Sequence, residues 1–577
     1  MKTFAIKARK KLIDEILDRI QMFSLDSKTE LPNLLPKNPV KQECFLQLQR
    51  QIEENDVLSV AEQAACVWFH RLVSIWFMEV NEYLPTEPFF SRFSPNGFKR
   101  NDVDADTLEE KEEMQYWKTY GYTEQEAAAQ ILFMRVCSQL GRIFPQLFSC
   151  YAQPVDFLIP KFHVDSVIYE FLSLPKEDFV LSQGGQAEMI GWLYQYFHTE
   201  RKEETFALLQ KNIKITKERI PAATQLFTPD WIVRYMVENS VGKLWLEQHP
   251  NAELEEKWTY YLKSNNTSSR EKYSTELRPQ DITILDPCMG SGHILVYAFD
   301  ILMDIYGSQG YTKREAAGQI IANNLYGLEI DDSVSELAHF VIMMKARFYD
   351  ETILEQSRCV HICSIQESNE ITDNLRQEIW QQFSMLEEEE RLAIDFVIDA
   401  FRDAKTYGSC LQMTQRFQPK FYEKTARRLR EIITDNTFDF NLEQWAIINQ
   451  WFPLLIALLE QADLLTRTYL VTITNPPYMG KKSLNKKIST FLETNYPNGK
   501  SELYAAFILR CKAFTKEFGY FSMVTMHTWM FLTSFQKLRL EILKHNHIES
   551  MVHAGAATFE ELNSFNVLAL SLIHIFS

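Results

Sequence analysis

The sequence predicts an α/β fold in which a parallel sheet follows a helical N-terminal domain. Residues 1 to 220 carry apolar side chains mainly at helical spacing. From Asp281 onward, short β-rich runs alternate with helical runs, which is the pattern of βαβ units and a parallel sheet. Residues 367–460 interrupt that alternation with a charged, helical block. We therefore expect two domains, 1–220 and 221–577, with a helical insertion in the second.

The strands of the expected sheet are short apolar runs. They lie at residues 282–285, 325–329, 360–365, 469–474, 520–524, 548–553 and 565–576. Helices are expected between the first strands at residues 294–306 and 333–349. The chain ends one residue after the last apolar run, so we expect the second domain to be incomplete at its C-terminus.

Composition restricts the classes of function. The formal charge of −17 argues against a protein that covers nucleic acid with its whole surface, so any nucleic-acid contact is expected to be local. The nine cysteines include no pair of CxxC motifs, which indicates reduced thiols and no metal site. Neither a signal peptide nor an apolar run long enough for a membrane span is present, which predicts a cytoplasmic location without membrane contact.

A glycine-containing turn joins the first expected strand to the first helix. Asp286 and Pro287 begin this turn, and Gly290 and Gly292 allow it to be sharp and let a ligand approach the backbone. The third glycine of the dinucleotide fingerprint is missing, and a carboxylate at the strand tip repels pyrophosphate. Asp286 instead suits a ligand with a cationic end, such as the ammonium group of S-adenosylmethionine. Glu329 ends the next strand, where an acid commonly holds ribose hydroxyls; simple solvation is the alternative.

Thr228 and Pro229 precede an amphipathic segment that starts at Trp231. We interpret Thr228 as the N-cap of a helix and Pro229 as its first residue. The free N–H groups of a helix N-terminus can hold a carboxylate, here the methionine carboxylate of the cofactor. As an isolated motif, the pair is ordinary helix capping.

The most informative motif follows the strand at 469–474. Asn475 carries a carboxamide oxygen that can accept a hydrogen bond from an amino group on a flat ring. Pro476 and Pro477 present carbonyl acceptors without N–H donors, and Tyr478 can stack on a base drawn out of a duplex. A tight surface turn is the alternative. For the five lysines that follow, phosphate binding and a solvated charge run are equally open: Lys481, Lys482, Lys486, Lys487 and Lys500.

The order of these motifs resembles the gamma class of amino-methyltransferases. In that family a Thr-Pro helix start, a DPxxGSG turn, an acid-ended strand and an NPPY loop follow one another, as they do here. The resemblance implies a Rossmann-like class I methyltransferase sheet that binds S-adenosylmethionine. Asn475, Pro476, Pro477 and Tyr478 would form its catalytic loop.

Four segments extend this resemblance to the BREX phage-exclusion adenine-specific DNA methyltransferases: residues 4–12, 191–197, 286–295 and 361–368. The family implies site-specific N6-adenine methylation of double-stranded DNA with a flipped adenine, alongside other phage-defence proteins. Its members are longer, with target recognition in a C-terminal part that this sequence does not contain.

One departure from the family pattern concerns the third strand. Many relatives place an aspartate after it, in contact with the adenine amino group of the cofactor, and residues 360–366 contain none. Gln366 or a backbone group is the candidate replacement. Three other functions remain open at this point: the methyltransferase part of a restriction–modification enzyme, a transferase acting on RNA or a protein amide, and a truncated cofactor-binding scaffold without turnover.

Overall fold

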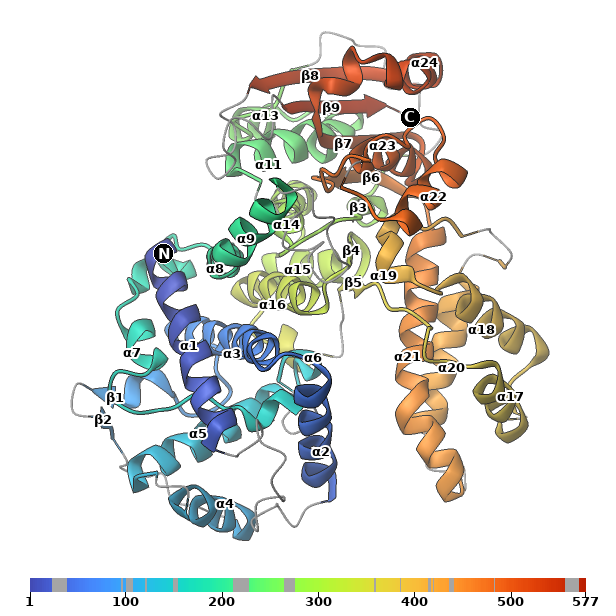
Figure 1. Ribbon diagram of the computed structural model, residues 1–577. Coiled ribbons are helices and arrows are strands. Elements are labelled where there is room, and N and C mark those ends of the chain that lie inside the picture. Colours follow the sequence, from blue (N-terminus) through green and yellow to red (C-terminus); the bar gives the residue numbers. More distant parts are fainter. Residues whose placement is uncertain are drawn as a thin grey trace. The chain divides into compact units, whose positions relative to one another are not determined.

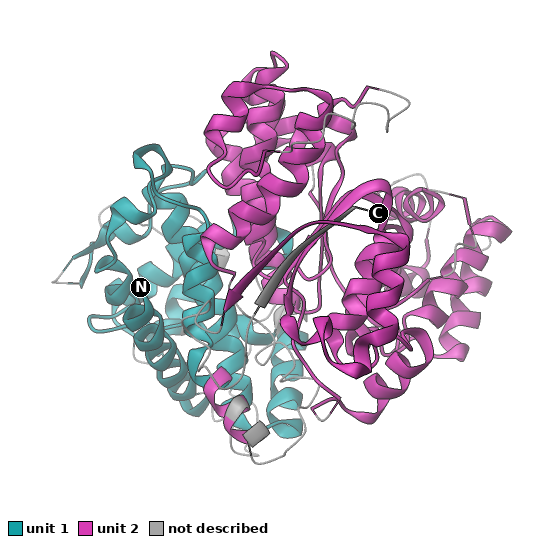
Figure 2. Cartoon of the chain, turned by 90° about the horizontal axis from the view of Figure 1, so that it is seen from above, with its two compact units in different colours: residues 1–201 teal, residues 202–577 magenta. Residues whose placement is uncertain are grey.

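The protein is described here from a computed structural model. It describes residues 1–22, 39–94, 97–99, 107–119, 122–148, 154–210, 228–263, 276–356, 360–383, 385–413, 417–418, 420–434, 440–481, 483–555 and 570–576. The chain divides into two compact units, Met1–Arg201 and Lys202–Ser577 (Figure 2). The domain boundary expected at residue 220 lies outside the described residues.

In its described residues, unit 1 is helical apart from a hairpin of two short strands, β1 (Phe93–Ser94) and β2 (Gly97–Phe98). Its core is built on α3 (Val57–Val80), in which Trp68, Phe69, Trp76 and Phe77 are buried. These rings therefore pack the interior, as their helical spacing predicts. The other helices are α1 (Lys2–Met22), α2 (Pro39–Glu54), α4 (Leu108–Thr119), α5 (Glu124–Leu140), α6 (Pro145–Phe148), α7 (Val167–Leu172), α8 (Met189–Phe197) and α9 (Thr199–Gln210), which runs on into unit 2.

Unit 2 contains a seven-stranded sheet in the order β5-β4-β3-β6-β7-β9-β8 (Figure 1). Strands β3 to β7 pair in parallel, whereas β9 pairs antiparallel with both β7 and β8. This mixed sheet is the Rossmann-like arrangement that the sequence predicts. The strands are β3 (Ile284–Asp286), β4 (Leu325–Glu329), β5 (His361–Ser364), β6 (Tyr469–Thr474), β7 (Thr515–Met526), β8 (His547–Gly555) and β9 (Leu570–Phe576).

Alternating side chains on β4 show which helices cover each face of the sheet. A Cβ added at Gly327 would lie 3.1 Å from a methyl group of Leu295 on α14, so this face packs on α14. Tyr326 and Leu328 point the other way and join the core of the helical insertion. Helices outside the insertion are α11 (Asp230–Val237), α12 (Lys243–Gln248), α13 (Ala252–Lys257), α14 (His293–Ser308), α15 (Lys313–Asn323), α16 (Asp332–Tyr349), α22 (Lys486–Asn495), α23 (Leu503–Phe514) and α24 (Gln536–His545).

The helical insertion lies between β5 and β6. Its core buries apolar side chains from every main helix together with Leu285 and Tyr469 of the sheet, so it is part of the same folding unit. Its helices are α17 (Asp373–Gln382), α18 (Glu388–Ala400), α19 (Ala404–Tyr407), α20 (Phe421–Thr434) and α21 (Leu442–Thr466). None of the helices in the described part of the chain is both long and apolar enough to cross a membrane.

Strand order reverses between β3 and β6. From β3 the chain moves outward through β4 and β5, and after the insertion it returns to pair β6 with the other edge of β3. In open α/β sheets, ligands bind outside the carboxyl ends of the strands at such a switch point. The glycine turn follows β3 and the Asn475 loop follows β6, so both leave the sheet at this position.

Candidate active site

Asp286 is the last residue of β3, and its carboxylate is fully buried. One oxygen, Oδ1, accepts hydrogen bonds from the Thr474 hydroxyl at 2.8 Å and from the Cys288 backbone N–H at 3.0 Å. The other oxygen, Oδ2, is buried and has no hydrogen-bond partner among the described residues. A buried carboxylate oxygen without a partner is costly, so this atom marks a position where the fold leaves polar capacity for a ligand.

The glycine turn is tied to the end of β4 by Glu329. Its Oε2 accepts from the Gly290 N–H at 2.8 Å, and its Oε1 accepts from the Ile330 and Asp331 N–H groups at 2.8 and 3.1 Å. Gly290 and Gly292 both adopt positive φ, at 54° and 82°, which favours glycine. A Cβ at Gly290 would meet nothing within 4 Å, so a ligand can approach the backbone there. The Pro287 carbonyl accepts from the hydroxyl of Ser409, a residue of the insertion.

Burial sets the protonation of both carboxylates. It raises the pKa of Asp286 to about 7, an effect that the hydrogen bonds from Thr474 and Cys288 oppose and that the Glu329 charge increases. Burial likewise raises the pKa of Glu329 to about 7, with the Asp331 charge adding to it and three backbone N–H groups opposing it. A cationic ligand group beside either carboxyl would lower its pKa, because it would stabilise the ionised form.

Asn475 follows β6 directly, and its carboxamide is held at both ends. Nδ2 donates to the Thr228 hydroxyl at 3.1 Å, and Oδ1 accepts from the Tyr478 hydroxyl. The Tyr478 hydroxyl also lies 3.2 Å from the Val524 carbonyl of β7. These contacts fix the orientation of the amide, with its oxygen toward Tyr478 and its nitrogen toward Thr228.

Thr228 lies in this network rather than at a helix end. The prediction that it caps a helix with Pro229 as the first helical residue is wrong, because α11 begins at Asp230 and Pro229 precedes it in an extended conformation. The Thr228 side chain is buried against Asn475 and so is not free to cap the helix. The two motifs at 228–229 and 475–478 are thus in direct contact.

The rest of the Asn475 loop combines buried and accessible groups. Pro476 is buried and Pro477 half-buried, and the Pro476 carbonyl accepts no hydrogen bond from any described residue. The Tyr478 ring is half-buried beside Tyr504, with ring centroids 6.3 Å apart. Among the lysines that follow, Lys481 and Lys487 form ion pairs with Glu493 and Asp403; Lys482 lies outside the described residues.

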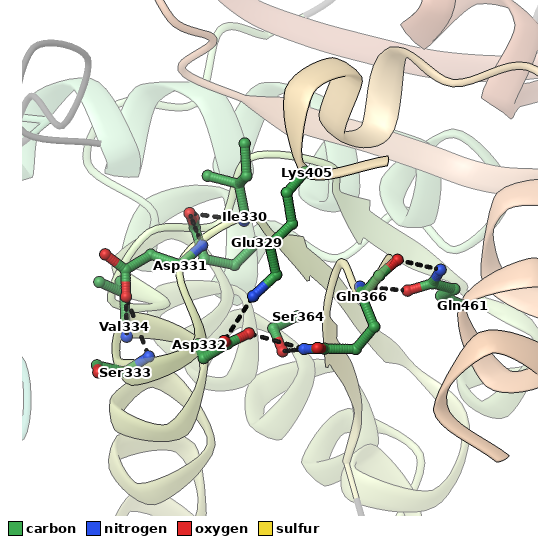
Figure 3. Close-up of polar contacts among 10 residues, drawn as sticks. All are labelled: Glu329, Ile330, Asp331, Asp332, Ser333, Val334, Ser364, Gln366, Lys405 and Gln461. Carbon is green, nitrogen blue, oxygen red and sulfur yellow. Dashed lines mark hydrogen bonds and ion pairs between the residues drawn. The ribbon is translucent and has the colours of Figure 1, made fainter. Parts of the chain in front are cut away.

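Gln366 follows β5 and is held by a polar network (Figure 3). Its Nε2 donates to Asp332 Oδ1 and to the Ser364 hydroxyl, both at 2.7 Å. Its backbone N–H and carbonyl pair with the side chain of Gln461, at 2.7 and 2.9 Å. The second oxygen of Asp332 accepts from Lys405 at 2.6 Å, so Gln461 and Lys405 connect the helical insertion to this strand end.

Sequence reasoning missed two contributors. It did not single out Thr474, which holds Asp286, and it assigned only the ring of Tyr478, not the hydroxyl that holds Asn475. A signal for Thr474 was available in the sequence, since Thr472 and Thr474 are two polar residues in an otherwise apolar strand. In the structure both threonines are fully buried and both are hydrogen-bonded. The Tyr478 hydroxyl had no signal in the sequence, since its partner is fixed by how the loop folds back.

The residues present fit S-adenosylmethionine. The unpaired buried Asp286 oxygen suits an ammonium group, and the open space at Gly290 suits close approach of a ligand to the backbone. Glu329 remains able to accept from hydroxyl groups, because each carboxylate oxygen has further acceptor capacity. These two carboxylate acceptors thus match a ligand with an ammonium group and a ribose.

Comparisons with known proteins show what the chain is similar to. Residues 323–559 match the family model "Eco57I restriction-modification methylase". The chain is 32% identical over 97% of its length to the adenine-specific methyltransferase PglX of Lacticaseibacillus casei (strain Zhang), covering 49% of that protein. It is 31% identical over 89% of its length to the adenine-specific methyltransferase BrxX of Escherichia coli O9:H4 (strain HS), covering 44%. The chain therefore spans about half the length of these curated relatives.

A comparison with solved structures finds the type ISP restriction-modification enzyme LlaGI, a nuclease-deletion mutant in complex with a DNA substrate mimic, at 13% identity. The alignment covers all of this chain and 34% of that one, with a TM-score of 0.41. The resemblance drawn from the motifs is confirmed by the sequence relatives: this chain is similar to the PglX and BrxX adenine-specific methyltransferases over most of its own length, and its residues 323–559 match the Eco57I restriction-modification methylase model.

Proposed function

We propose that this chain carries the catalytic part of a site-specific DNA adenine N6-methyltransferase that uses S-adenosylmethionine. One observation supports the proposal above all others. The oriented Asn475 carboxamide follows the end of β6, and the neighbouring strand β3 ends with Asp286, whose Oδ2 has no partner among the described residues, and with the glycine turn. Methyl transfer requires the cofactor and the amino group that accepts the methyl to bind side by side, and two neighbouring strand ends can provide this. The names of the relatives that match most of the chain agree with it.

Three groups would hold the cofactor. Asp286 Oδ2 takes the ammonium group, which provides the missing partner for a buried charge. Glu329 accepts from ribose hydroxyls while it keeps the Gly290 turn closed. The N-terminus of α11, next to Pro229, offers N–H groups to the methionine carboxylate. When bound, the cofactor supplies a methyl group on a sulfonium centre that needs no further activation.

The Asn475 loop prepares the acceptor nitrogen. Asn475 Oδ1 and the free Pro476 carbonyl accept the two N6 hydrogens of adenine, which draws the nitrogen away from planarity and frees its lone pair for attack. The hydrogen bond that Asn475 donates to Thr228 and the one that it accepts from Tyr478 hold its amide in place before the base arrives, so orientation contributes to the rate. As the N6–methyl bond forms, the bond between that methyl group and the cofactor sulfur would break, which would leave a neutral thioether, and the methylated N6 would release its extra proton to water.

The target base has to leave the DNA stack to reach this loop. Unstacking costs a few kcal/mol, and stacking of a base on an aromatic ring recovers about 1–3 kcal/mol. We assign that stacking to Tyr478, with its hydroxyl anchored to the loop. The substrate is therefore double-stranded DNA with a flipped adenine.

We place the activity in phage defence of the BREX type, in a cytoplasmic setting and together with other proteins of that system. The similarity to PglX and BrxX over most of the chain supports this. The match of residues 323–559 to a restriction-modification methylase favours, as second candidate, the methyltransferase part of a restriction–modification enzyme. The chemistry at the site is the same in both.

The test is Asn475→Ala, with Asn498→Ala as a matched control. Asn498 is also a half-buried asparagine with a side-chain hydrogen bond, to Glu541, but it lies outside the site. Methyl transfer from labelled S-adenosylmethionine to adenine in unmethylated DNA is measured, and S-adenosylhomocysteine binding is followed by calorimetry.

We expect Asn475→Ala to abolish transfer and to leave cofactor binding unchanged, because the amide contacts the acceptor and not the cofactor. Asn498→Ala should behave as the unmodified chain. Transfer at a near-normal rate in Asn475→Ala would remove Asn475 from catalysis. Failure of the unmodified chain to bind the cofactor would overturn the proposal itself.

A further inference from the structure

A short turn of the helical insertion, Gly408–Cys410, contacts the glycine turn of the proposed cofactor site. Within it, Ser409 is buried, and its hydroxyl donates a hydrogen bond to the backbone carbonyl of Pro287, a residue that is also buried. No other residue in the described part of the chain donates to this carbonyl. The insertion therefore supplies the hydrogen-bond partner of a buried backbone group in the glycine turn.

That backbone group is linked to the Asp286 carboxylate. The Pro287 carbonyl and the Cys288 N–H belong to one planar peptide group, in which they point in opposite directions. Ser409 holds the carbonyl, and Asp286 Oδ1 accepts from the N–H at 3.0 Å, so the two contacts together fix the rotation of this peptide group. The orientation of the carboxylate depends on the same N–H, because it occupies Oδ1 and leaves Oδ2 as the oxygen without a partner among the described residues.

The Gly408–Cys410 turn is itself anchored by residues that lie outside the insertion. Arg510 of α23 is buried, and its Nε donates to the Ser409 carbonyl at 3.0 Å. Its Nη2 donates to the Leu465 carbonyl near the end of α21 at 3.1 Å, so the same guanidinium holds two parts of the insertion. The Tyr496 hydroxyl donates to the Cys410 carbonyl. Ser409 is therefore held in place independently of its contact with Pro287.

Gly408 allows the chain to bend so that Ser409 faces the glycine turn. It adopts φ 56° and ψ −149°, a conformation that is essentially restricted to glycine. A Cβ added at Gly408 would lie 4.0 Å from Cδ1 of Ile330, the residue that follows Glu329. The turn thus lies against the segments that follow both β3 and β4, which are the two strands that end in the carboxylates of the proposed cofactor site.

We propose that Ser409 is a positioning residue for the amino-acid end of the cofactor: through the peptide group between Pro287 and Cys288, it keeps the Asp286 carboxylate with Oδ2 available to the ligand ammonium group. This inference rests on the proposed function, because it takes S-adenosylmethionine as the ligand. Without the hydroxyl, the buried Pro287 carbonyl has no partner, which is costly. Rotation of the peptide group toward another donor would then withdraw the Cys288 N–H from Asp286.

The test compares two ligands that share the adenosine and thioether groups but differ in the amino-acid end. S-adenosylhomocysteine carries the ammonium and carboxylate groups, whereas methylthioadenosine lacks both. Their affinities for the unmodified chain are measured by calorimetry at pH 8. We expect S-adenosylhomocysteine to bind more tightly, because only this ligand has an ammonium group that can contact Asp286 Oδ2.

The variant Ser409→Ala should lower the affinity for S-adenosylhomocysteine about five- to tenfold and leave that for methylthioadenosine within about twofold. This is the effect of weakening, without removing, one charge-assisted hydrogen bond. Ser409→Cys keeps a weak donor at the same position and should give an intermediate ratio of the two affinities. The matched control is Ser368→Ala: Ser368 is also a buried serine of the insertion, and its hydroxyl donates to the carbonyl of Ile398, away from the glycine turn. Its ratio should be unchanged.

A double-mutant cycle tests whether Ser409 acts through Asp286. In the Asp286→Asn background the carboxylate oxygen that Ser409 positions is gone, so adding Ser409→Ala should not change the affinity ratio further. Additive effects of the two replacements would contradict the proposed route.

The affinity ratio separates positioning from a general structural role, because loss of folded structure lowers both affinities together. A ratio kept in Ser409→Ala, or an equal fall of both affinities, would overturn the inference while the proposed function holds. Equal affinity of the unmodified chain for the two ligands would also overturn it, since there would be no ammonium contact to position. No binding of either ligand to the unmodified chain would instead contradict the proposed function.

Discussion

The replacement Asp286→Asn tests the charge at the centre of the proposed cofactor site. Asparagine has the same shape, and its Oδ1 can keep the hydrogen bonds from Thr474 and Cys288. The atom that changes is Oδ2, which has no partner among the described residues and becomes an NH2 group. The replacement thus alters one ligand contact and leaves the local packing intact.

The magnitude follows from the number of free atoms. Because Oδ1 is already used twice, the ligand ammonium meets a single oxygen and forms one charge-assisted hydrogen bond. Such a bond contributes about 1.5–3 kcal/mol, which corresponds to an affinity loss of roughly 10- to 150-fold. Stability should change in the opposite direction: burial raises the Asp286 pKa to about 7, so at pH 8 the free protein carries a buried charge that asparagine removes.

The assay is calorimetric titration with S-adenosylhomocysteine at pH 8, together with thermal unfolding of the free protein. The control is Asp281→Asn, five residues upstream, where the carboxylate is half-exposed and paired with Arg278. We expect weaker binding and an equal or higher melting temperature in Asp286→Asn, and unchanged binding in Asp281→Asn. Unchanged affinity in Asp286→Asn, or a lower melting temperature, would show that Asp286 is a structural residue and not a ligand contact.

Two further predictions concern pH and the catalytic loop. Burial raises the pKa values of Asp286 and Glu329 to about 7, so the folded state binds more protons than the unfolded state between about pH 4 and 7, and the stability of the free protein should fall as pH rises through that range. A cationic ligand group stabilises the ionised carboxylate, so the increase in melting temperature with S-adenosylhomocysteine should be larger at pH 8 than at pH 5.5. Asp286→Asn should lose most of this difference between the two pH values. An increase in melting temperature that does not depend on pH in the unmodified chain would contradict the assignment. Tyr478→Phe removes the hydroxyl that holds Asn475, so it should slow methyl transfer several-fold, equivalent to about 1 kcal/mol, without changing cofactor affinity. The control is Tyr504→Phe, which loses a hydrogen bond with Thr528. Equal transfer rates in the two variants would argue against a positioning role for the Tyr478 hydroxyl.

Local pattern predicted much of the sheet. The expected strands at 325–329 and 469–474 coincide with β4 and β6, since both are short apolar runs with clear boundaries. The expected strand at 520–524 is the middle of the longer β7, which begins at Thr515. Its first part was missed because the charged residues Lys516 and Glu517 break the apolar pattern, and Phe518 interrupts the extended backbone with a φ of 65°.

Other features could not be predicted from local pattern. Helix α15 was not predicted, because it is a polar segment rich in good helix formers whose apolar stripe is weak. The capping role expected of Thr228 failed for a non-local reason, because its side chain is buried against Asn475. Which face of the sheet the helical insertion covers also depended on the packing of Tyr326 and Leu328 against its core.

The sequence by itself determined the kinds of groups present and their order: a carboxylate and two glycines after one strand, an acid after the next, and an Asn-Pro-Pro-Tyr loop after a third. Periodicity and turn chemistry are local, so they can be read along the chain. Only the tertiary structure decided which of these groups touch, since the bond from Asn475 to Thr228 joins residues 247 positions apart and that from Thr474 to Asp286 spans 188. Such contacts depend on how the strands pair and the helices pack, which no local pattern encodes.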